Sequence, residues 1–360
     1  MRQRSLSRVV HALALFTPAL LLSSCGSPPP QDPYCSYAAL PGGLEVKSGQ
    51  GALQIEGIDD TYFYALDETG KQLGYQSLGK TLGLNPGKYQ AKVNNSLHPV
   101  SVQKNMLTKC STGTLAVAGE TGEYYYVLDS AGQQLHYDTL GKASSLWPGP
   151  YRVKVNNTLI QAEAKLDQIT EVKTGTLLVH GATEEYYYVL DSAGQQLAYN
   201  TLGKSLALLP GSYNLKVNNT ASKADIAGGQ TSEVRTGGLL VKGTTEEYYY
   251  VLDSLGEQLA YQTLNKTLAL FPGSYRLRVN KSESAAAVVA EQMLEAQTGS
   301  LIVEGTAGDY YYVLDKAGTQ LGYNGLGKAL SFFPGEYTVK FGQSQRPASL
   351  RAGQRISVRF

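Results

Sequence analysis

A seven-residue segment recurs along the chain at a fixed distance, and this period constrains the fold more than any other feature. The segment Glu-Tyr-Tyr-Tyr-Val-Leu-Asp spans residues 123–129, and a turn-like Ser-Ala-Gly follows it. Its aspartate returns every 62 residues, at Asp67, Asp129, Asp191, Asp253 and Asp315. A regular period of this size is the signature of a tandem array. The sequence therefore predicts five repeats, at residues 51–112, 113–174, 175–236, 237–298 and 299–360.

The composition is that of a folded chain with little net charge. The 360 residues include 31 Lys and Arg, 30 Asp and Glu, and 42% hydrophobic residues. Removing residues 1–24 removes three arginines and no acid, so the net charge of the remainder is about −2. This balance predicts neither nucleic-acid binding nor attraction to an anionic membrane surface.

Residue alternation within one repeat predicts β-strands. In the third repeat, Leu177 and Val179 alternate with positions that other repeats fill with polar residues, which places these two side chains inward. Residues 186–190 form an aromatic and β-branched run, which is typical of a strand. Asp191 and Gly194 then occupy the first and fourth positions expected of a type I turn.

The second half of the repeat continues the pattern. Residues 213–217 alternate apolar and polar side chains after the turn at Pro210-Gly211, and Asn218-Asn219 suit a tight turn with positive φ. Two weaker strands follow, giving six or seven strands in 62 residues without helical periodicity. The sequence thus predicts an all-β chain, a tandem array of five small antiparallel β-sandwich domains.

This repeat resembles the PEGA domain and related, Ig-like β-sandwiches of bacterial envelopes, over residues 49–360. The residues that carry the resemblance are Leu190-Asp191, Gly194, Pro210-Gly211-Ser212-Tyr213 and Gly229-Gln230-Thr231. The tetrapeptide that names the family is absent, and Thr183-Glu184-Glu185-Tyr186 stands in its place. The resemblance implies surface-layer or envelope interaction modules without catalytic residues.

The N-terminus resembles the signal peptide of a bacterial lipoprotein. Three arginines precede a short apolar run that ends in Leu22-Ser23-Ser24-Cys25, which matches the lipobox at all four positions. The resemblance implies cleavage after residue 24, lipid on Cys25 and an envelope location, at the outer membrane if the organism has two membranes. The alternative is an ordinary secretory signal with a chance cysteine. Residues 25–33 form a proline-rich tether and residues 34–50 a lead-in strand.

Two further cysteines, Cys35 and Cys110, are expected to form a disulfide. Leftover thiols of an exported protein often pair. Cys110 also takes the position held by valine in other repeats. The alternative is two free, buried thiols.

Two sets of residues are candidates for a binding surface. Counting back by two from Leu190 places Tyr188 and Tyr186 inward and Tyr187 outward, so the exposed set is expected to be Phe63, Tyr125, Tyr187, Tyr249 and Tyr311. The second set precedes each Pro-Gly turn, and its apolar members are Trp147, Leu209, Phe271 and Phe333. Exposed aromatic residues could bind sugars or a protein. Alternatively, both sets pack against a neighbouring repeat or cover an edge of the sandwich.

No motif in the sequence indicates catalysis, a metal site or a cofactor. Apart from His11 in the signal segment, the histidines occupy different positions of different repeats, at His98, His136 and His180. No Gly-x-Ser-x-Gly, His-Glu-x-x-His or phosphate-binding loop occurs. We therefore expect a non-enzymatic envelope array with structural or protein-interaction roles. The alternative is a multivalent glycan-binding array.

Overall fold

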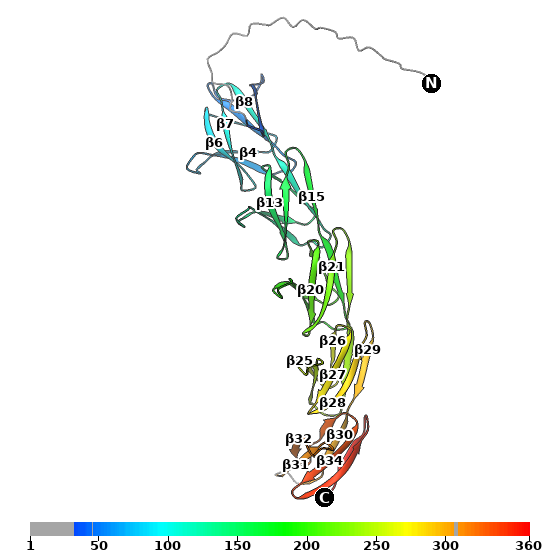
Figure 1. Cartoon of the computed structure of the whole chain (residues 1–360). Helices are drawn as coiled ribbons and strands as arrows, with labels where there is room; N and C mark the ends of the chain where they lie inside the picture. Colours follow the sequence, from blue (N-terminus) through cyan, green and yellow to red (C-terminus); the bar gives the residue numbers. More distant parts are fainter. Residues whose placement is uncertain (1–31, 45, 306–308) are drawn as a thin grey trace, which may run out of the picture. The chain divides into compact units, whose positions relative to one another are not determined.

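The computed structural model describes residues 32–44, 46–305 and 309–360, so the lipidation predicted at Cys25 lies outside the described residues. The chain divides into two units, residues 1–33 and residues 34–360, and every strand of the described residues belongs to the second (Figure 1). Within the described residues the secondary structure is entirely β, and no helix is long and apolar enough to cross a membrane.

Each repeat contributes seven strands, and the first repeat is preceded by one more. The first repeat and its lead-in contain β1 (Cys35–Ala39), β2 (Gly51–Glu56), β3 (Tyr62–Leu66), β4 (Gln72–Ser77), β5 (Thr81–Leu84), β6 (Gly87–Val93), β7 (Ser96–Val102) and β8 (Met106–Ser111). The second contains β9 (Gly113–Ala118), β10 (Tyr124–Leu128), β11 (Gln134–Thr139), β12 (Ala143–Leu146), β13 (Gly149–Val155), β14 (Thr158–Ala164) and β15 (Ile169–Lys173). The third contains β16 (Gly175–His180), β17 (Tyr186–Leu190), β18 (Gln196–Thr201), β19 (Ser205–Leu208), β20 (Gly211–Val217), β21 (Thr220–Ile226) and β22 (Thr231–Arg235).

The last two repeats follow the same order. The fourth contains β23 (Gly237–Lys242), β24 (Tyr248–Leu252), β25 (Gln258–Thr263), β26 (Thr267–Leu270), β27 (Gly273–Val279), β28 (Ser282–Val288) and β29 (Met293–Gln297). The fifth contains β30 (Gly299–Val303), β31 (Tyr310–Leu314), β32 (Gln320–Gly325), β33 (Leu330–Phe332), β34 (Gly335–Phe341), β35 (Ser344–Leu350) and β36 (Arg355–Val358). The expected all-β array of five repeated sheet pairs is therefore confirmed.

Two sheets make up each repeat. In the third repeat the four-stranded sheet has the order β18-β17-β20-β21 and is antiparallel throughout, and the three-stranded sheet has the order β19-β16-β22. One pair departs from the expected antiparallel pattern, because β22 runs parallel to β16. Side-chain alternation has the same period in both kinds of pairing, so the sequence pattern does not distinguish them.

The turns lie where the sequence places them. The Oδ1 atom of Asp191 accepts the backbone N–H groups of Ala193 and Gln195 at 2.9 and 2.8 Å, and Gly194 has a φ of 83°. Asn218 and Asn219 have φ angles of 47° and 57°, in the left-handed region that asparagine tolerates. Side-chain hydrogen bonding and backbone freedom thus fix both hairpins of the four-stranded sheet.

The core of each repeat shows that the predicted orientation of the tyrosine strand was wrong. Tyr187 is fully buried, and Tyr186 is 53% exposed. Within β17 the alternation is regular: Tyr187 and Val189 are buried, whereas Tyr188 and Leu190 are only partly buried. Leu190 thus falls in the same phase of the alternation as Tyr186 and Tyr188, and the extra residue of the adjacent bulge, Leu197, belongs to β18. Counting back from Leu190 therefore gave the wrong face.

The same correction applies to every repeat. The residues expected to be exposed are all fully buried, namely Phe63, Tyr125, Tyr187, Tyr249 and Tyr311. The tyrosine hydroxyl groups have internal partners: that of Tyr125 is 2.7 Å from Ser144 Oγ, and that of Tyr187 donates to the Lys204 carbonyl at 3.0 Å. Burial raises the pKa of Tyr125 to about 12. These residues belong to the core.

Candidate functional site

Successive repeats are connected by a joint built around one apolar side chain, which we call the plug residue. The plug residues precede the Pro-Gly turns and are Trp147, Leu209, Phe271 and Phe333. Phe271 of the fourth repeat is 1% exposed and packs in the core of the third repeat, beside Leu215 and Val217. The other plug residues likewise lie in the core of the preceding repeat. Of the two interpretations of this set, packing on a neighbouring repeat is the correct one.

Hydrogen bonds fix the backbone of the plug. The Phe271 N–H donates to Thr220 Oγ1 at 3.0 Å, and the Thr220 hydroxyl donates to the Val217 carbonyl at 2.6 Å. Asn218 Nδ2 donates to the Ala269 carbonyl at 3.0 Å. The corresponding bonds recur at the other joints, with Ser96, Thr158 or Ser282 in place of Thr220. The asparagines that form the hairpin turn of one repeat thus also bind the next repeat.

A carboxylate completes each joint. Glu185 Oε2 accepts the N–H of Ala269 at 2.7 Å, and Glu123 and Glu247 do the same for the repeats that follow them. At the first joint Asp59 has this role, although it stands two positions earlier in its repeat. Burial at the joint raises the pKa of Glu123, while hydrogen bonds from Ala207 and Asn156 oppose this effect.

The covalent junction is one residue long. Thr236 alone separates β22 from β23, and its hydroxyl donates to the His180 carbonyl at 2.9 Å. Gly181 lies against this junction, because an added Cβ there would be 2.6 Å from Leu202 Cδ1 and 2.8 Å from Thr236 Oγ1. A side chain at this glycine would therefore require Leu202 or the Thr236 side chain of the junction to shift. Short connection and close packing together restrict rotation between neighbouring repeats.

In each repeat, the outer face of the sheet that contains the tyrosine strand bears three tyrosines and one cationic residue, which we call the tyrosine cluster. In the third repeat it consists of Tyr186, Tyr188, Tyr199 and Lys216. Tyr188 pairs across the strands with Tyr199 on one side and Lys216 on the other. The Tyr199 ring centroid lies 5.7 Å from that of Tyr186 and 6.2 Å from that of Tyr188. The Lys216 Nζ lies 5.6 Å from the Tyr188 ring centroid.

The tyrosine cluster recurs in all five repeats. Its first tyrosine is Tyr62, Tyr124, Tyr186, Tyr248 or Tyr310, and its cross-strand tyrosine is Tyr75, Tyr137, Tyr199, Tyr261 or Tyr323. All ten side chains are exposed. Sequence reasoning missed this surface because it placed Tyr186 and Tyr188 inward. One signal was available: the buried position is the one where a repeat replaces tyrosine by phenylalanine, at Phe63, so a hydroxyl is not required there.

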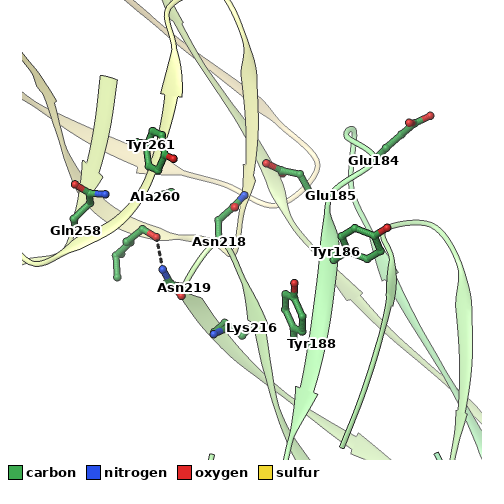
Figure 2. Close-up of a pocket in the computed structure, with 11 residues that line it drawn as sticks. Glu184, Glu185, Tyr186, Tyr188, Lys216, Asn218, Asn219, Gln258, Ala260 and Tyr261 are labelled. Carbon is green, nitrogen blue, oxygen red and sulfur yellow. Dashed lines mark hydrogen bonds between the residues drawn. The ribbon is translucent and has the colours of Figure 1, made fainter. Parts of the chain in front are cut away.

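A groove of about 620 Å³ connects the tyrosine cluster of the third repeat with that of the fourth (Figure 2). Tyr186, Tyr188 and Lys216 line it from the third repeat, and Gln258 and Tyr261 line it from the fourth. Between them Asn219 Nδ2 donates to the Leu259 carbonyl at 2.8 Å, the bond drawn in Figure 2. The floor of the groove is therefore part of the joint.

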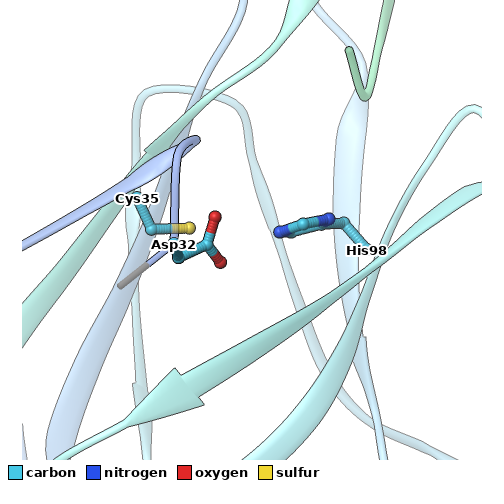
Figure 3. A group of neighbouring side chains, drawn as sticks. All are labelled: Asp32, Cys35 and His98. Carbon is cyan, nitrogen blue, oxygen red and sulfur yellow. The ribbon is translucent and has the colours of Figure 1, made fainter. Parts of the chain in front are cut away.

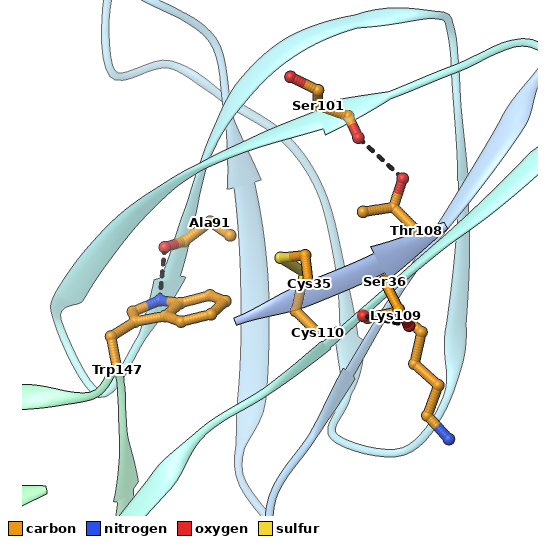
Figure 4. The surroundings of a disulfide bond; sticks show 8 residues. All are labelled: Cys35, Ser36, Ala91, Ser101, Thr108, Lys109, Cys110 and Trp147. Atoms are coloured by element: carbon orange, nitrogen blue, oxygen red, sulfur yellow. Dashed lines mark hydrogen bonds between the residues drawn. A yellow bond between two sulfur atoms is a disulfide. The ribbon is translucent and has the colours of Figure 1, made fainter. Parts of the chain in front are cut away.

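A disulfide closes the first repeat. Cys35 of β1 is joined to Cys110 of β8, its register partner, and the sulfur atoms lie near the Trp147 indole (Figure 4). The indole N–H of Trp147 donates to the Ala91 carbonyl at 2.9 Å. The disulfide thus links the lead-in strand to the same core that receives the first plug residue.

The environment of His98 is aromatic. Its ring centroid lies 4.6 Å from that of Trp147 and 5.0 Å from that of Tyr34. Figure 3 shows His98 near Cys35, whose sulfur is already bonded to Cys110 and is not available as a thiolate ligand. We therefore interpret His98 as part of the packing around the first plug residue.

Comparisons with known proteins assign the chain to no family. No family model matches it, and no curated protein matches it. The solved structure of the Bacillus anthracis TIE protein is 12% identical, with 92% of this chain and 72% of that chain covered and a TM-score of 0.18. The Bacillus cereus major pilin subunit BcpA is 10% identical, with 52% and 99% covered and a TM-score of 0.17. The Lactobacillus rhamnosus GG pilus adhesin SpaC is 13% identical, with 67% and 38% covered and a TM-score of 0.15. At these scores the fold assignment rests on the strands and sheets described above.

Proposed function

We propose that the chain is a non-catalytic scaffold of the bacterial cell envelope, anchored by lipid on Cys25, whose fixed repeats present equivalent surfaces to a partner. The observation that carries this proposal is the joint, which is built in the same way at four successive boundaries. Each joint combines a buried plug residue, side-chain hydrogen bonds and a one-residue connection. Such contacts stabilise a defined orientation between neighbours, as nearest-neighbour interfaces do in repeat proteins.

The repetition itself favours binding over catalysis. An active site requires different chemical groups in an asymmetric arrangement around one substrate. Here the same side chains return in successive repeats, and the hydroxyl groups of the buried tyrosines are engaged within the core. Repeated identical surfaces instead suit multivalent binding, in which several weak contacts act together.

Distance measurements between spin labels test the fixed joint. With labels at Ser192→Cys and Ser254→Cys, which are exposed and equivalent in the third and fourth repeats, we expect one narrow distance distribution by pulsed electron spin resonance. Cys25 is replaced by serine in this experiment, and Cys35 and Cys110 are protected by their disulfide.

The matched control carries Asn218→Ala and Phe271→Ala in the same labelled chain. Loss of the Phe271 side chain and of the hydrogen bond from Asn218 to the Ala269 carbonyl should broaden the distribution. A broad distribution in the parent chain would show that the repeats move freely, and the scaffold proposal would then fail.

Metabolic labelling tests the anchor. We expect the parent chain to incorporate labelled palmitate and to fractionate with membranes, because the residues before Cys25 resemble a lipobox and two or more acyl chains give stable anchoring. Cys25→Ser should abolish both properties, and Ser27→Ala should preserve them. Labelling that persists in Cys25→Ser would contradict the assignment.

A further inference from the structure

We propose that each tyrosine cluster is a saccharide-binding subsite and that the subsites together bind one polysaccharide chain that carries acidic groups. The inference deepens the scaffold function proposed above and rests on it for the fixed spacing of the subsites.

The exposure of the cluster is the first observation. Tyr186 and Tyr199 are 53% and 57% exposed, and their ring centroids lie 5.7 Å apart. Surface tyrosines gathered in this way present flat apolar rings together with hydroxyl groups. Sugar rings have the complementary character, with apolar C–H faces and hydroxyl groups at their edges.

The cation is the second observation. The amine of Lys216 lies over the face of Tyr188, and Lys92 and Lys154 lie 4.8 and 5.0 Å from the corresponding tyrosine rings of their repeats. Within the part of the chain that the structure describes, none of these lysines forms an ion pair. Arg278 takes this place in the fourth repeat and pairs with Glu283. An unpaired ammonium beside open aromatic rings suits a carboxylate or phosphate on the sugar.

The groove is the third observation. Its volume of about 620 Å³ lies within the range of roughly 300–1,000 Å³ found for small-ligand pockets. It extends from Tyr186 and Lys216 across the joint to Gln258 and Tyr261, so a chain bound at one cluster has a path to the next. A comparable groove of about 740 Å³ adjoins Tyr310, Tyr312 and Lys340 in the fifth repeat.

The acidic side chains near the groove do not oppose an acidic ligand in every repeat. Glu185 is bound to the Ala269 N–H at the joint. Glu184 lines the groove and carries a negative charge, but its equivalent in the second repeat is Gly122. The lysine or arginine, in contrast, is present in all five repeats, at Lys92, Lys154, Lys216, Arg278 and Lys340.

The repetition favours a polysaccharide over a protein partner. Engaging several identical subsites at once requires a ligand whose own chemistry repeats, and a polysaccharide has this property. The cores of protein interfaces are also depleted in lysine, whereas four of the five clusters contain one.

Affinity electrophoresis of the full chain in detergent tests the proposal. The gels contain alginate, polygalacturonate, hyaluronate or, as a neutral comparison, hydroxyethylcellulose. We expect at least one acidic polysaccharide to retard the protein more than the neutral one, and added salt to weaken the effect. Tyr137→Ser, Tyr199→Ser and Tyr261→Ser combined should weaken the apparent affinity by at least about tenfold, because avidity multiplies the loss at each subsite.

The matched control replaces three exposed apolar residues outside the clusters, Ile169→Ser, Leu255→Ser and Val289→Ser, and should bind like the parent. Lys154→Gln with Lys216→Gln should reduce the preference for the acidic polysaccharide. Absence of retardation by all acidic polysaccharides would overturn the proposal. So would equal binding by the tyrosine variant, or a protein partner that binds the clusters while the polysaccharides do not. A narrow spin-label distribution alongside such a failure would leave the scaffold function standing.

Discussion

Replacing Phe271 with alanine should destabilise the joint between the third and fourth repeats by about 3–5 kcal/mol, the usual cost of truncating a buried phenylalanine. Phe271 is 1% exposed, and its ring packs in the core of the third repeat although it belongs to the fourth. The truncation therefore leaves a cavity in one repeat and removes the main apolar contact between two. The backbone hydrogen bond from residue 271 to Thr220 uses no side-chain atom of Phe271 and should persist.

Urea unfolding of the full chain measures this effect. We expect the third repeat to unfold at lower urea than in the parent chain, with its transition separated from that of the fourth. Phe271→Leu is the matched control, because Leu209 fills the equivalent place at another joint, and it should cost less than half as much. Asn85→Ala, at the exposed equivalent position of the first repeat, should have little effect. A loss below about 1 kcal/mol in Phe271→Ala would contradict the assigned role of the plug.

Removing the disulfide should destabilise the first repeat by about 4 kcal/mol in the chain-entropy model. The cross-link closes a loop with a sequence separation of 75 residues, which restricts the unfolded chain strongly. It also holds β1 against β8, so its loss should release the lead-in strand first. The other four repeats contain no cysteine and should be unaffected.

The double variant Cys35→Ser with Cys110→Val measures the contribution of the cross-link. Valine at residue 110 preserves packing, since Val172, Val234 and Val358 occupy this position in other repeats. Urea unfolding with and without dithiothreitol should show a reductant-sensitive transition in the parent and an insensitive one at lower urea in the double variant. Identical unfolding of the two proteins would refute a stabilising cross-link.

Much of the fold could be predicted from sequence because its determinants are local. The 62-residue period, the Asp191 turn and the left-handed asparagines Asn218 and Asn219 each depend on neighbours in the chain. The inward position of Leu177 and Val179 was also correct, because simple alternation holds in β16.

The orientation of β17 could not be read in the same way. Leu190 falls in the same phase of the alternation as the exposed Tyr186, so this apolar residue at the end of β17 was a misleading reference for the inward face. The candidate surface consequently changed from Tyr187 to Tyr186, Tyr188 and Tyr199. The plug residues posed a different difficulty, because the side chain of Phe271 packs in the core of another repeat. The alternation of apolar and polar residues within one repeat does not report burial against a neighbouring repeat.

Because the joint is built in the same way at each boundary, a middle repeat can pack against another copy of itself. A middle repeat inserts a plug residue into the repeat before it, as Phe271 does. It also holds the repeat after it through side-chain hydrogen bonds, which Asn280 donates and Ser282 and Glu247 accept. Inserting or deleting one whole 62-residue unit among the middle repeats therefore regenerates every contact at the new boundaries. Gene duplication and unequal recombination can change the number of units without redesigning any interface. The reach of the molecule and its number of tyrosine clusters are thus free to evolve together, one unit at a time.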